Sequence, residues 1–121
     1  MFDVDFYTDS HGRQPVRELL LELRDKAQTS KGMRIQYKKV LACIRALEVY
    51  GTRVGEPYVK HIDGDIWELR PLSRRVLFFY WRDNRYILLH HFVKKTRKTP
   101  AGEIEQAKRN MDDFIERGGR L

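Results

Sequence analysis

The sequence predicts a single α+β domain over residues 1–121, with the element order β-α-α-β-β-β-α, a mostly antiparallel sheet and helices packed against one face. Three observations support this prediction. Three stretches repeat apolar residues every three to four positions, as amphipathic helices do. Four other stretches alternate apolar and polar residues or run apolar, as strands do. No internal repeat, low-complexity tract or Pro/Ser-rich linker divides the chain.

The first half of the chain predicts a strand followed by two helices. The segment "FDVDFYTD" alternates apolar and polar residues, as expected for a strand with one solvated face. Pro15 suits the first position of a helix, and Gly51 can end a helix with positive φ. The two apolar stripes between these residues are Val16, Leu19, Leu20, Leu23 and Ala27, then Tyr37, Val40, Leu41, Ile44 and Leu47.

The second half predicts a loop, three strands and a final helix. The loop is "TRVGEPYVKHIDGD", and the strands are Ile66–Arg70, Arg75–Trp81 and Arg85–Val93. The middle strand is apolar on both faces, so we expect it at the centre of the sheet. The dipeptide Asp83-Asn84 favours a tight hairpin turn.

The final helix is predicted to begin with Thr99 as its cap and Pro100 at its first position. Gly118-Gly119 is predicted to end it. Its apolar stripe consists of Ile104, Ala107, Met111, Phe114 and Ile115.

Composition excludes several classes of protein. The single cysteine, Cys43, excludes an internal disulfide framework and a cysteine-based zinc site, and its apolar setting favours a buried thiol. No apolar run approaches the about 20 residues of a membrane span, and the acidic N-terminus is unlike a signal peptide. We therefore expect a cytoplasmic protein with no membrane partner. No nucleotide-binding or metal-binding motif occurs, so no cofactor is predicted.

The whole chain has a net charge of +7, and its positive charge is concentrated in the middle of the sequence. Residues 31–99 contain sixteen Lys and Arg against six Asp and Glu, whereas residues 1–30 contain four against six. Residues 100–121 contain four against five. This distribution favours a surface that binds a polyanion, and the alternative is a basic, well-solvated protein.

Within this region, cations and histidines accumulate around the predicted strands. They are Lys60, His61, Arg70, Arg74, Arg75, His90, His91, Lys94, Lys95, Arg97 and Lys98. Such a set can bind phosphates or stabilise the charge of a pentacoordinate phosphorus during RNA cleavage. RNA supplies its own 2′-hydroxyl nucleophile, so this reaction needs no metal. His90 and His91 are adjacent on a strand and point to opposite faces, so we expect one of them in the core.

Two segments resemble a known family: "EPYVKHIDGDIWELRPLSRRVLFFYW" and "ILLHHFVKKTRKTPAGEIEQAKRNMDDF". The sequence is similar to the HigB-like toxins of bacterial type II toxin–antitoxin pairs, which belong to the RelE/ParE superfamily and overlap a group of phage-derived proteins. The resemblance covers nearly the whole chain and includes "YGTRVGEPYVKHI". It implies a RelE-like fold and a metal-independent endoribonuclease that cuts mRNA on the ribosome and inhibits translation. It also implies a cognate helix-turn-helix (HigA-like) antitoxin as partner.

The resemblance implies roles for particular residues. Arg70, Arg75 and either Lys94 or Lys95 would grip the scissile phosphate. Lys60 or His61 would transfer a proton, and His91 is a second candidate for that role. The last helix contains no tyrosine, so the base stays open. The alternative is a ParE-like toxin or binding module, which shares the fold, cleaves nothing and inhibits a protein such as DNA gyrase.

Overall fold

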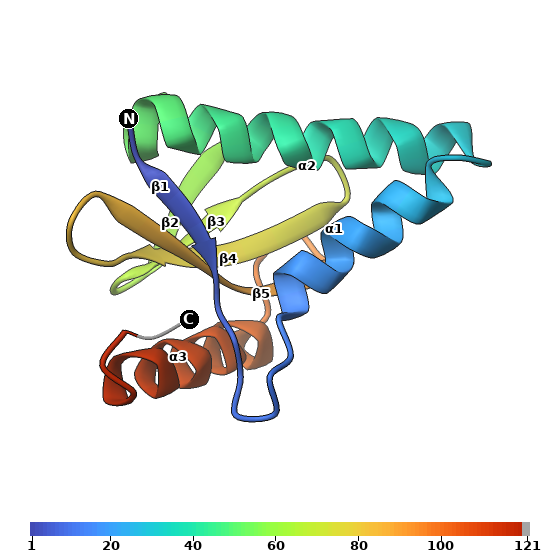
Figure 1. Ribbon diagram of the computed structural model, residues 1–121. Helices are drawn as coiled ribbons and strands as arrows, with labels where there is room; N and C mark the ends of the chain where they lie inside the picture. Colours follow the sequence, from blue (N-terminus) through green and yellow to red (C-terminus); the bar gives the residue numbers. More distant parts are fainter. Residues whose placement is uncertain (120–121) are drawn as a thin grey trace.

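A five-stranded sheet with the strand order β1-β5-β4-β3-β2 runs through the computed structural model, which describes residues 1–119 (Figure 1). The strands are β1 (Asp3–Phe6), β2 (Val59–Asp63), β3 (Ile66–Leu69), β4 (Arg74–Tyr80) and β5 (Arg85–Val93). The helices are α1 (Pro15–Lys26), α2 (Lys31–Tyr50) and α3 (Ala101–Glu116), with a short 3-10 turn at Gly51–Val54. Only the β1–β5 pair is parallel among the pairs of this sheet. The α+β class is confirmed, and the arrangement is compatible with a RelE-like fold.

Helices cover both faces of the sheet, so the prediction that they pack on one face was wrong. Figure 1 shows α1 and α2 on one side and α3 on the other. In β4, Val76 and Phe78 pack with α1 and α2, whereas Leu77 and Phe79 pack with α3. A central strand that is apolar on both faces has to be covered on both, because either apolar face would otherwise remain in water.

The segment predicted as a loop contains the edge strand β2, which pairs antiparallel with β3. Only Val59 of this strand is buried, and Ile62 is half-buried. Lys60 and His61 are exposed, because an edge strand at the rim of a sheet is covered by less of the protein. The apolar signal in the sequence was therefore two residues long, too short to indicate a strand.

Two turns confirm the sequence interpretation. Asp83 and Asn84 both have positive φ, 60° and 58°, as a two-residue hairpin turn of the primed type requires. Gly51 ends α2 with a φ of 63°, and its N–H donates to the carbonyl of Leu47. A Cβ atom at Gly51 would come within 2.8 Å of the Phe2 ring, so no larger residue fits there without a shift.

Thr99 does not cap the last helix, contrary to the prediction. The cap position belongs to Pro100, and α3 begins at Ala101. The Thr99 hydroxyl instead donates a 2.7 Å hydrogen bond to Glu68, on the neighbouring sheet. In this bond the hydroxyl donates to a buried carboxylate, whereas a helix cap would use its oxygen to accept from a backbone N–H.

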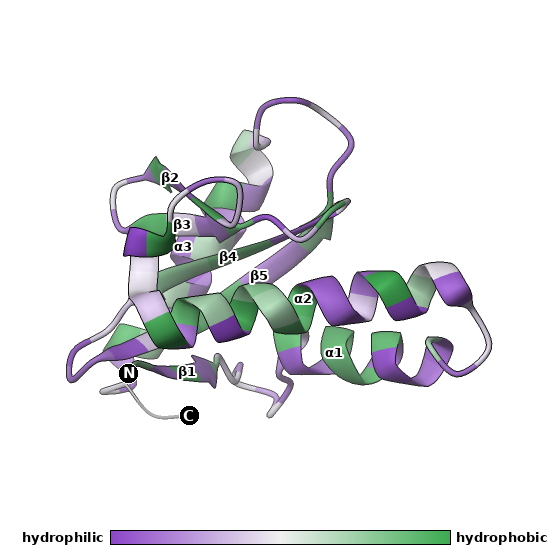
Figure 2. Cartoon of the chain, turned by 90° about the horizontal axis from the view of Figure 1, so that it is seen from above, coloured by the Kyte–Doolittle hydropathy of each residue, from purple (hydrophilic) through white to green (hydrophobic). Residues whose placement is uncertain are grey.

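The surface of α1 and α2 that faces away from the sheet is mixed in character. Figure 2, viewed from above, shows the two helices side by side with hydrophilic and hydrophobic residues alternating along them. The exposed cations of α2 include Arg34, Lys38, Lys39 and Arg45. Cys43 lies on the opposite, inner face of α2 and is buried, as predicted, and burial raises the pKa of its thiol. Among residues 1–119, no helix has the length and apolar character needed to cross a membrane.

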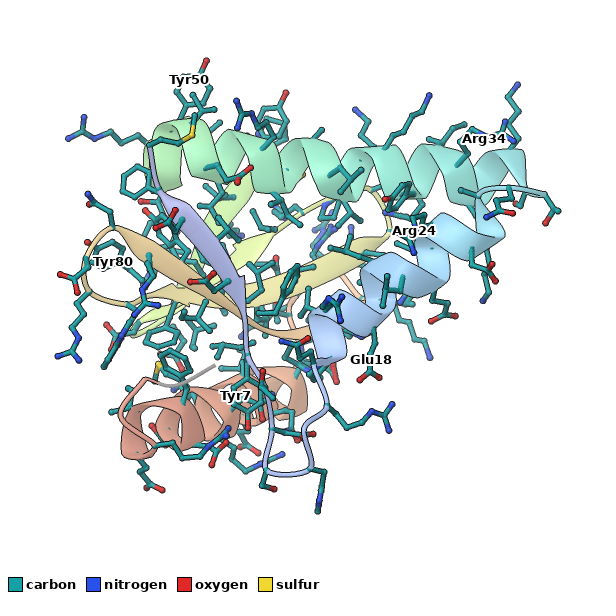
Figure 3. All side chains as sticks on the ribbon, in the orientation of Figure 1. Tyr7, Glu18, Arg24, Arg34, Tyr50 and Tyr80 are labelled. Atoms are coloured by element: carbon teal, nitrogen blue, oxygen red, sulfur yellow. The ribbon has the colours of Figure 1, made fainter. Side chains whose placement is uncertain are left out.

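A polar contact joins the end of β1 to α3. The Tyr7 hydroxyl donates a 2.5 Å hydrogen bond to Oδ2 of Asp113, and Arg117 donates to the same carboxylate and to the carbonyl of Thr8. Figure 3 shows Tyr7 between β1 and the last helix. Burial and the Asp113 carboxylate raise the pKa of Tyr7 to about 12. The contact thus holds the last helix against the N-terminal part of the chain.

Replacement of Tyr7 by phenylalanine is expected to lower the free energy of unfolding by about 1 kcal/mol at pH 7, because one hydrogen bond to a carboxylate is lost. The raised pKa also predicts a pH effect. The unfolded state loses the phenolic proton from about pH 10 and the folded state only near pH 12, so the contribution of Tyr7 is lost as the pH rises between these values. Urea denaturation of both proteins from pH 7 to pH 11 measures this. A constant difference between them over that range would contradict it.

Candidate functional site

Cations gather around a hollow of about 170 Å³ on the α3 side of the sheet. We call this the cationic hollow. It is lined by Lys60, His61, Ile62, Arg70, Arg97, Lys98, Thr99 and Ile104. Three segments that are far apart in the sequence meet here: the edge strand β2, the end of β3 and the link between β5 and α3. The sheet therefore brings three of the predicted site residues together, namely Lys60, His61 and Arg70.

The two predicted lysines that follow β5 do not line the cationic hollow. Lys95 borders a neighbouring hollow of about 400 Å³, together with Phe92 and Glu103. Lys94 is exposed, and its backbone N–H donates a 2.7 Å hydrogen bond to the carbonyl of Ser73. This bond fixes the start of the link next to the turn that precedes β4.

Most of these cations have no counter-ion in the part of the chain that the structure describes. Among the cations near this end of the sheet, Lys60, Lys94, Lys95, Arg97 and Lys98 are exposed and form no ion pair with any residue of 1–119. An unneutralised group of this kind produces a local positive potential that attracts polyanions. The geometry thus supports anion binding at this end of the sheet.

A buried carboxylate lies next to the hollow. The side chain of Glu68, in β3, is only 2% exposed. Its Oε2 accepts a 2.7 Å hydrogen bond from the Thr99 hydroxyl, and its Oε1 lies 3.5 Å from Nε of Arg70 and 3.6 Å from Nε of Arg75. We call these four residues the Glu68 cluster.

The sequence analysis did not identify Glu68 or the contact of Thr99. Glu68 stood in "IWELR" as one polar residue of an alternating strand. A signal was nevertheless present in the sequence. Because β4 is apolar on both faces, the strand β3 that pairs with it is also covered on both faces. An acidic residue inside such a strand needs a buried partner.

Arg75 is part of the buried interior. Its side chain is 8% exposed, and its Nη1 donates to the carbonyls of Leu72 and Arg74 at 2.8 and 2.7 Å. Burial lowers the pKa of Arg75, Glu68 opposes this effect, and Arg70 adds to it. Arg75 therefore holds the turn before β4, and its guanidinium is turned away from the solvent.

Arg70 is the accessible arginine of the Glu68 cluster, with a side chain that is 24% exposed. Its Nη1 lies 3.3 Å from Oε1 of Glu56, a carboxylate whose side chain is 63% exposed. Arg70 also borders a second hollow, of about 180 Å³, together with Tyr58 and Leu72. One side of its guanidinium thus faces the buried Glu68, and the other faces groups at the surface.

The adjacent histidines of β5 point to opposite faces, as predicted. His90 lies on the α3 side, where its Nε2 is 3.3 Å from Oε2 of Glu103. His91 pairs with Val76, a residue of the core beneath α1 and α2. Burial lowers the pKa of His91 and nearby Arg74 lowers it further. The structure therefore places His91 on the opposite side of the sheet from the cationic hollow.

His61 is exposed at the edge of the sheet. Its Nε2 lies 2.7 Å from the carbonyl oxygen of Gly64. Its ring packs edge-on against the Trp67 ring, with 5.1 Å between the two ring centroids. A carbonyl only accepts, so Nε2 carries the proton in this contact and Nδ1 is left for another partner. In the described part of the chain, no group of three or more His, Cys, Asp or Glu side chains is arranged to hold a metal ion.

Comparison with known proteins places the chain in a family. No curated protein matches the sequence. A family model described as phage-derived protein Gp49-like (DUF891) matches residues 18–112, which include α2, the four strands β2 to β5 and most of α3. With this match over most of its length, the chain belongs to the Gp49-like family of phage-derived proteins, a family of toxins from toxin–antitoxin pairs that is related to the RelE and HigB types.

Proposed function

We propose that this toxin is a metal-independent endoribonuclease of the HigB type that cleaves mRNA on the translating ribosome in the cytoplasm. The observation that carries the proposal is the cationic hollow, where Lys60, Arg70, Arg97 and Lys98 converge. A hollow of this charge suits the phosphate groups of a single-stranded RNA. Lys94 and Lys95, exposed in the same link as Arg97 and Lys98, suit the phosphates that flank the cleaved one.

The proposed reaction uses the substrate's own nucleophile. The 2′-hydroxyl attacks the adjacent phosphorus, the bond to the 5′-oxygen breaks, and the products are a 2′,3′-cyclic phosphate and a 5′-hydroxyl. Negative charge increases on the phosphoryl oxygens in the transition state. Preorganised cations that contact these oxygens stabilise that state more than the substrate, which accelerates the reaction. In this proposal Arg70 and Lys98 have that role.

Two residues of the hollow are assigned to proton transfer. With Nε2 of His61 bonded to the Gly64 carbonyl, Nδ1 of the neutral ring can accept the proton of the 2′-hydroxyl. Lys60, on the same strand, donates a proton to the leaving 5′-oxygen. Such positioned groups contribute on the order of 10²–10⁴-fold to the rate. We assign no chemical role to His91, because it lies on the α1 side of the sheet.

A pair of reporter mRNAs tests this function. One is translated, and the other differs only by a mutated start codon. Expression of the toxin is expected to arrest growth and to produce new 5′-hydroxyl ends in the translated reporter alone. Mapping of 5′ ends before and after induction measures this. Growth arrest without new ends would reject the nuclease and favour a ParE-like toxin that inhibits a protein such as DNA gyrase.

The antitoxin is the partner that the family implies, and we propose a helix-turn-helix protein of the HigA type. Its acidic residues would complement the exposed cations of this chain. Co-expression is expected to abolish both the growth arrest and the new 5′ ends. Relief of arrest with the ends still present would show that the antitoxin acts downstream of cleavage.

A further inference from the structure

We propose that Glu68 is a positioning residue that holds Arg70 and the Arg97–Thr99 segment in place on two sides of the cationic hollow. This inference rests on the proposed function of the hollow as a phosphate-binding and RNA-cleaving site. Glu68 contacts neither solvent nor any substrate that occupies the hollow, since its side chain is 2% exposed. Its effect on the reaction would pass through the groups that it contacts.

The two oxygens of the carboxylate contact two different segments. Oε2 accepts from the hydroxyl of Thr99 at 2.7 Å, and Thr99 follows directly on Arg97 and Lys98 in the link to α3. Oε1 lies 3.5 Å from Nε of Arg70, at the end of β3. One buried side chain on a strand thereby connects the two cationic walls of the hollow.

The contacts of Arg70 leave part of its guanidinium available to a substrate. Nε faces the buried Glu68, whereas Nη1 lies 3.3 Å from the exposed Glu56. An exposed ion pair of this kind contributes little to stability, so a phosphate can displace Glu56 at small cost. The buried contact with Glu68 would persist during this exchange and would keep the guanidinium in one orientation.

Stability alone gives no reason for a buried ion pair at this position. A buried ion pair can often be replaced by apolar side chains of similar size without loss of stability. Glu68 also separates Arg70 from Arg75, and without its charge these two guanidinium groups would repel each other. The cost of burying the carboxylate is explained if Arg70 has to be held in a fixed position beside the cationic hollow for function.

The test uses Glu68→Gln and Thr99→Val in the full chain, with Thr99→Ser as the conservative variant and Glu48→Gln as control. Glu48 is a half-buried carboxylate on α2, 3.9 Å from Arg45 and away from the hollow. Single-turnover cleavage of mRNA on programmed ribosomes, with the toxin in excess, gives a limiting rate and a half-saturating toxin concentration.

Glu68→Gln and Thr99→Val are expected to lower the limiting rate by about tenfold to a hundredfold, because a displacement of about 1 Å can cost this much. The half-saturating concentration should stay within about threefold, since the cations themselves remain. Thr99→Ser and Glu48→Gln should cleave at the wild-type rate. Wild-type limiting rates in both folded variants, Glu68→Gln and Thr99→Val, would overturn the proposal. If Glu68→Gln does not fold, Thr99→Val decides, because it leaves the carboxylate paired with both arginines.

A spectroscopic measurement separates this inference from the proposed function. The Nε–Hε resonances of Arg70 and Arg75 report directly on the orientation and hydrogen bonding of these side chains. We expect them to shift in Glu68→Gln, which removes the charge that both Nε atoms face, and to stay unchanged in Glu48→Gln. If the wild-type toxin cuts no RNA, the proposed nuclease function is rejected and these resonances alone decide whether Glu68 positions the arginines. Unchanged resonances would overturn the positioning role whether or not the protein cleaves RNA.

Discussion

Replacement of Arg70 by alanine is expected to slow mRNA cleavage by about 10²–10³-fold, the loss that follows removal of one preorganised donor to a developing negative charge. The chain should stay folded, because the buried Glu68 keeps its contacts with Arg75 and Thr99. The variant loses the surface ion pair with the exposed Glu56, which contributes little to stability, and one of the two arginine contacts of Glu68. Growth after induction and the rate of appearance of new 5′ ends measure the effect.

Lys38→Ala is a matched control for Arg70→Ala. Lys38 is an exposed cation of α2, so this variant loses the same charge at a distance from the cationic hollow. It should remain toxic. If Arg70→Ala has a native thermal transition and arrests growth as strongly as the wild type, Arg70 does not contact the scissile phosphate.

Replacement of Arg75 by alanine is expected to lower the free energy of unfolding by about 3 kcal/mol, because removing one partner of a buried ion pair leaves the other charge poorly compensated. The variant also leaves the carbonyls of Leu72 and Arg74 without the donor that now holds them at 2.8 and 2.7 Å. The control is Arg74→Ala, which removes a half-buried side chain that has no ion pair among residues 1–119. This substitution should lower the free energy of unfolding by less than about 1 kcal/mol. Urea denaturation at pH 7 compares them.

This result would separate two roles for Arg75. The sequence analysis grouped Arg75 with the phosphate-binding residues and therefore led us to expect that its removal would affect activity and leave the fold intact. The structure shows a buried side chain, so a loss of toxicity should accompany a loss of stability. A variant with wild-type stability and no cleavage would instead indicate that Arg75 contacts the substrate.

Local patterns in the sequence predicted most of the elements correctly. The periods of the apolar residues indicated the three helices and four of the five strands. Asp83-Asn84 indicated the hairpin turn, because few residues tolerate positive φ at two successive positions. The segments rich in lysine and arginine were also evident, since charge is a property of the residues themselves.

The edge strand β2 and the position of α3 could not be predicted in the same way. Both depend on what covers a segment after folding, and an exposed edge strand has only a short apolar pattern. The prediction that the helices share one face failed because the sequence of α3 shows that the helix has an apolar stripe but does not show which face of the sheet it covers.

The fold class, the family resemblance and the presence of a cationic end of the sheet all follow from the amino-acid sequence without the structure. The tertiary structure alone decided the state of each charged group. It buried Arg75, left Arg70 partly accessible, turned His91 towards α1 and placed Glu68 between the two arginines. The physical reason is that burial and pairing depend on residues far apart in the chain. Thr99, for example, contacts a carboxylate 31 positions away, and no local pattern encodes that bond.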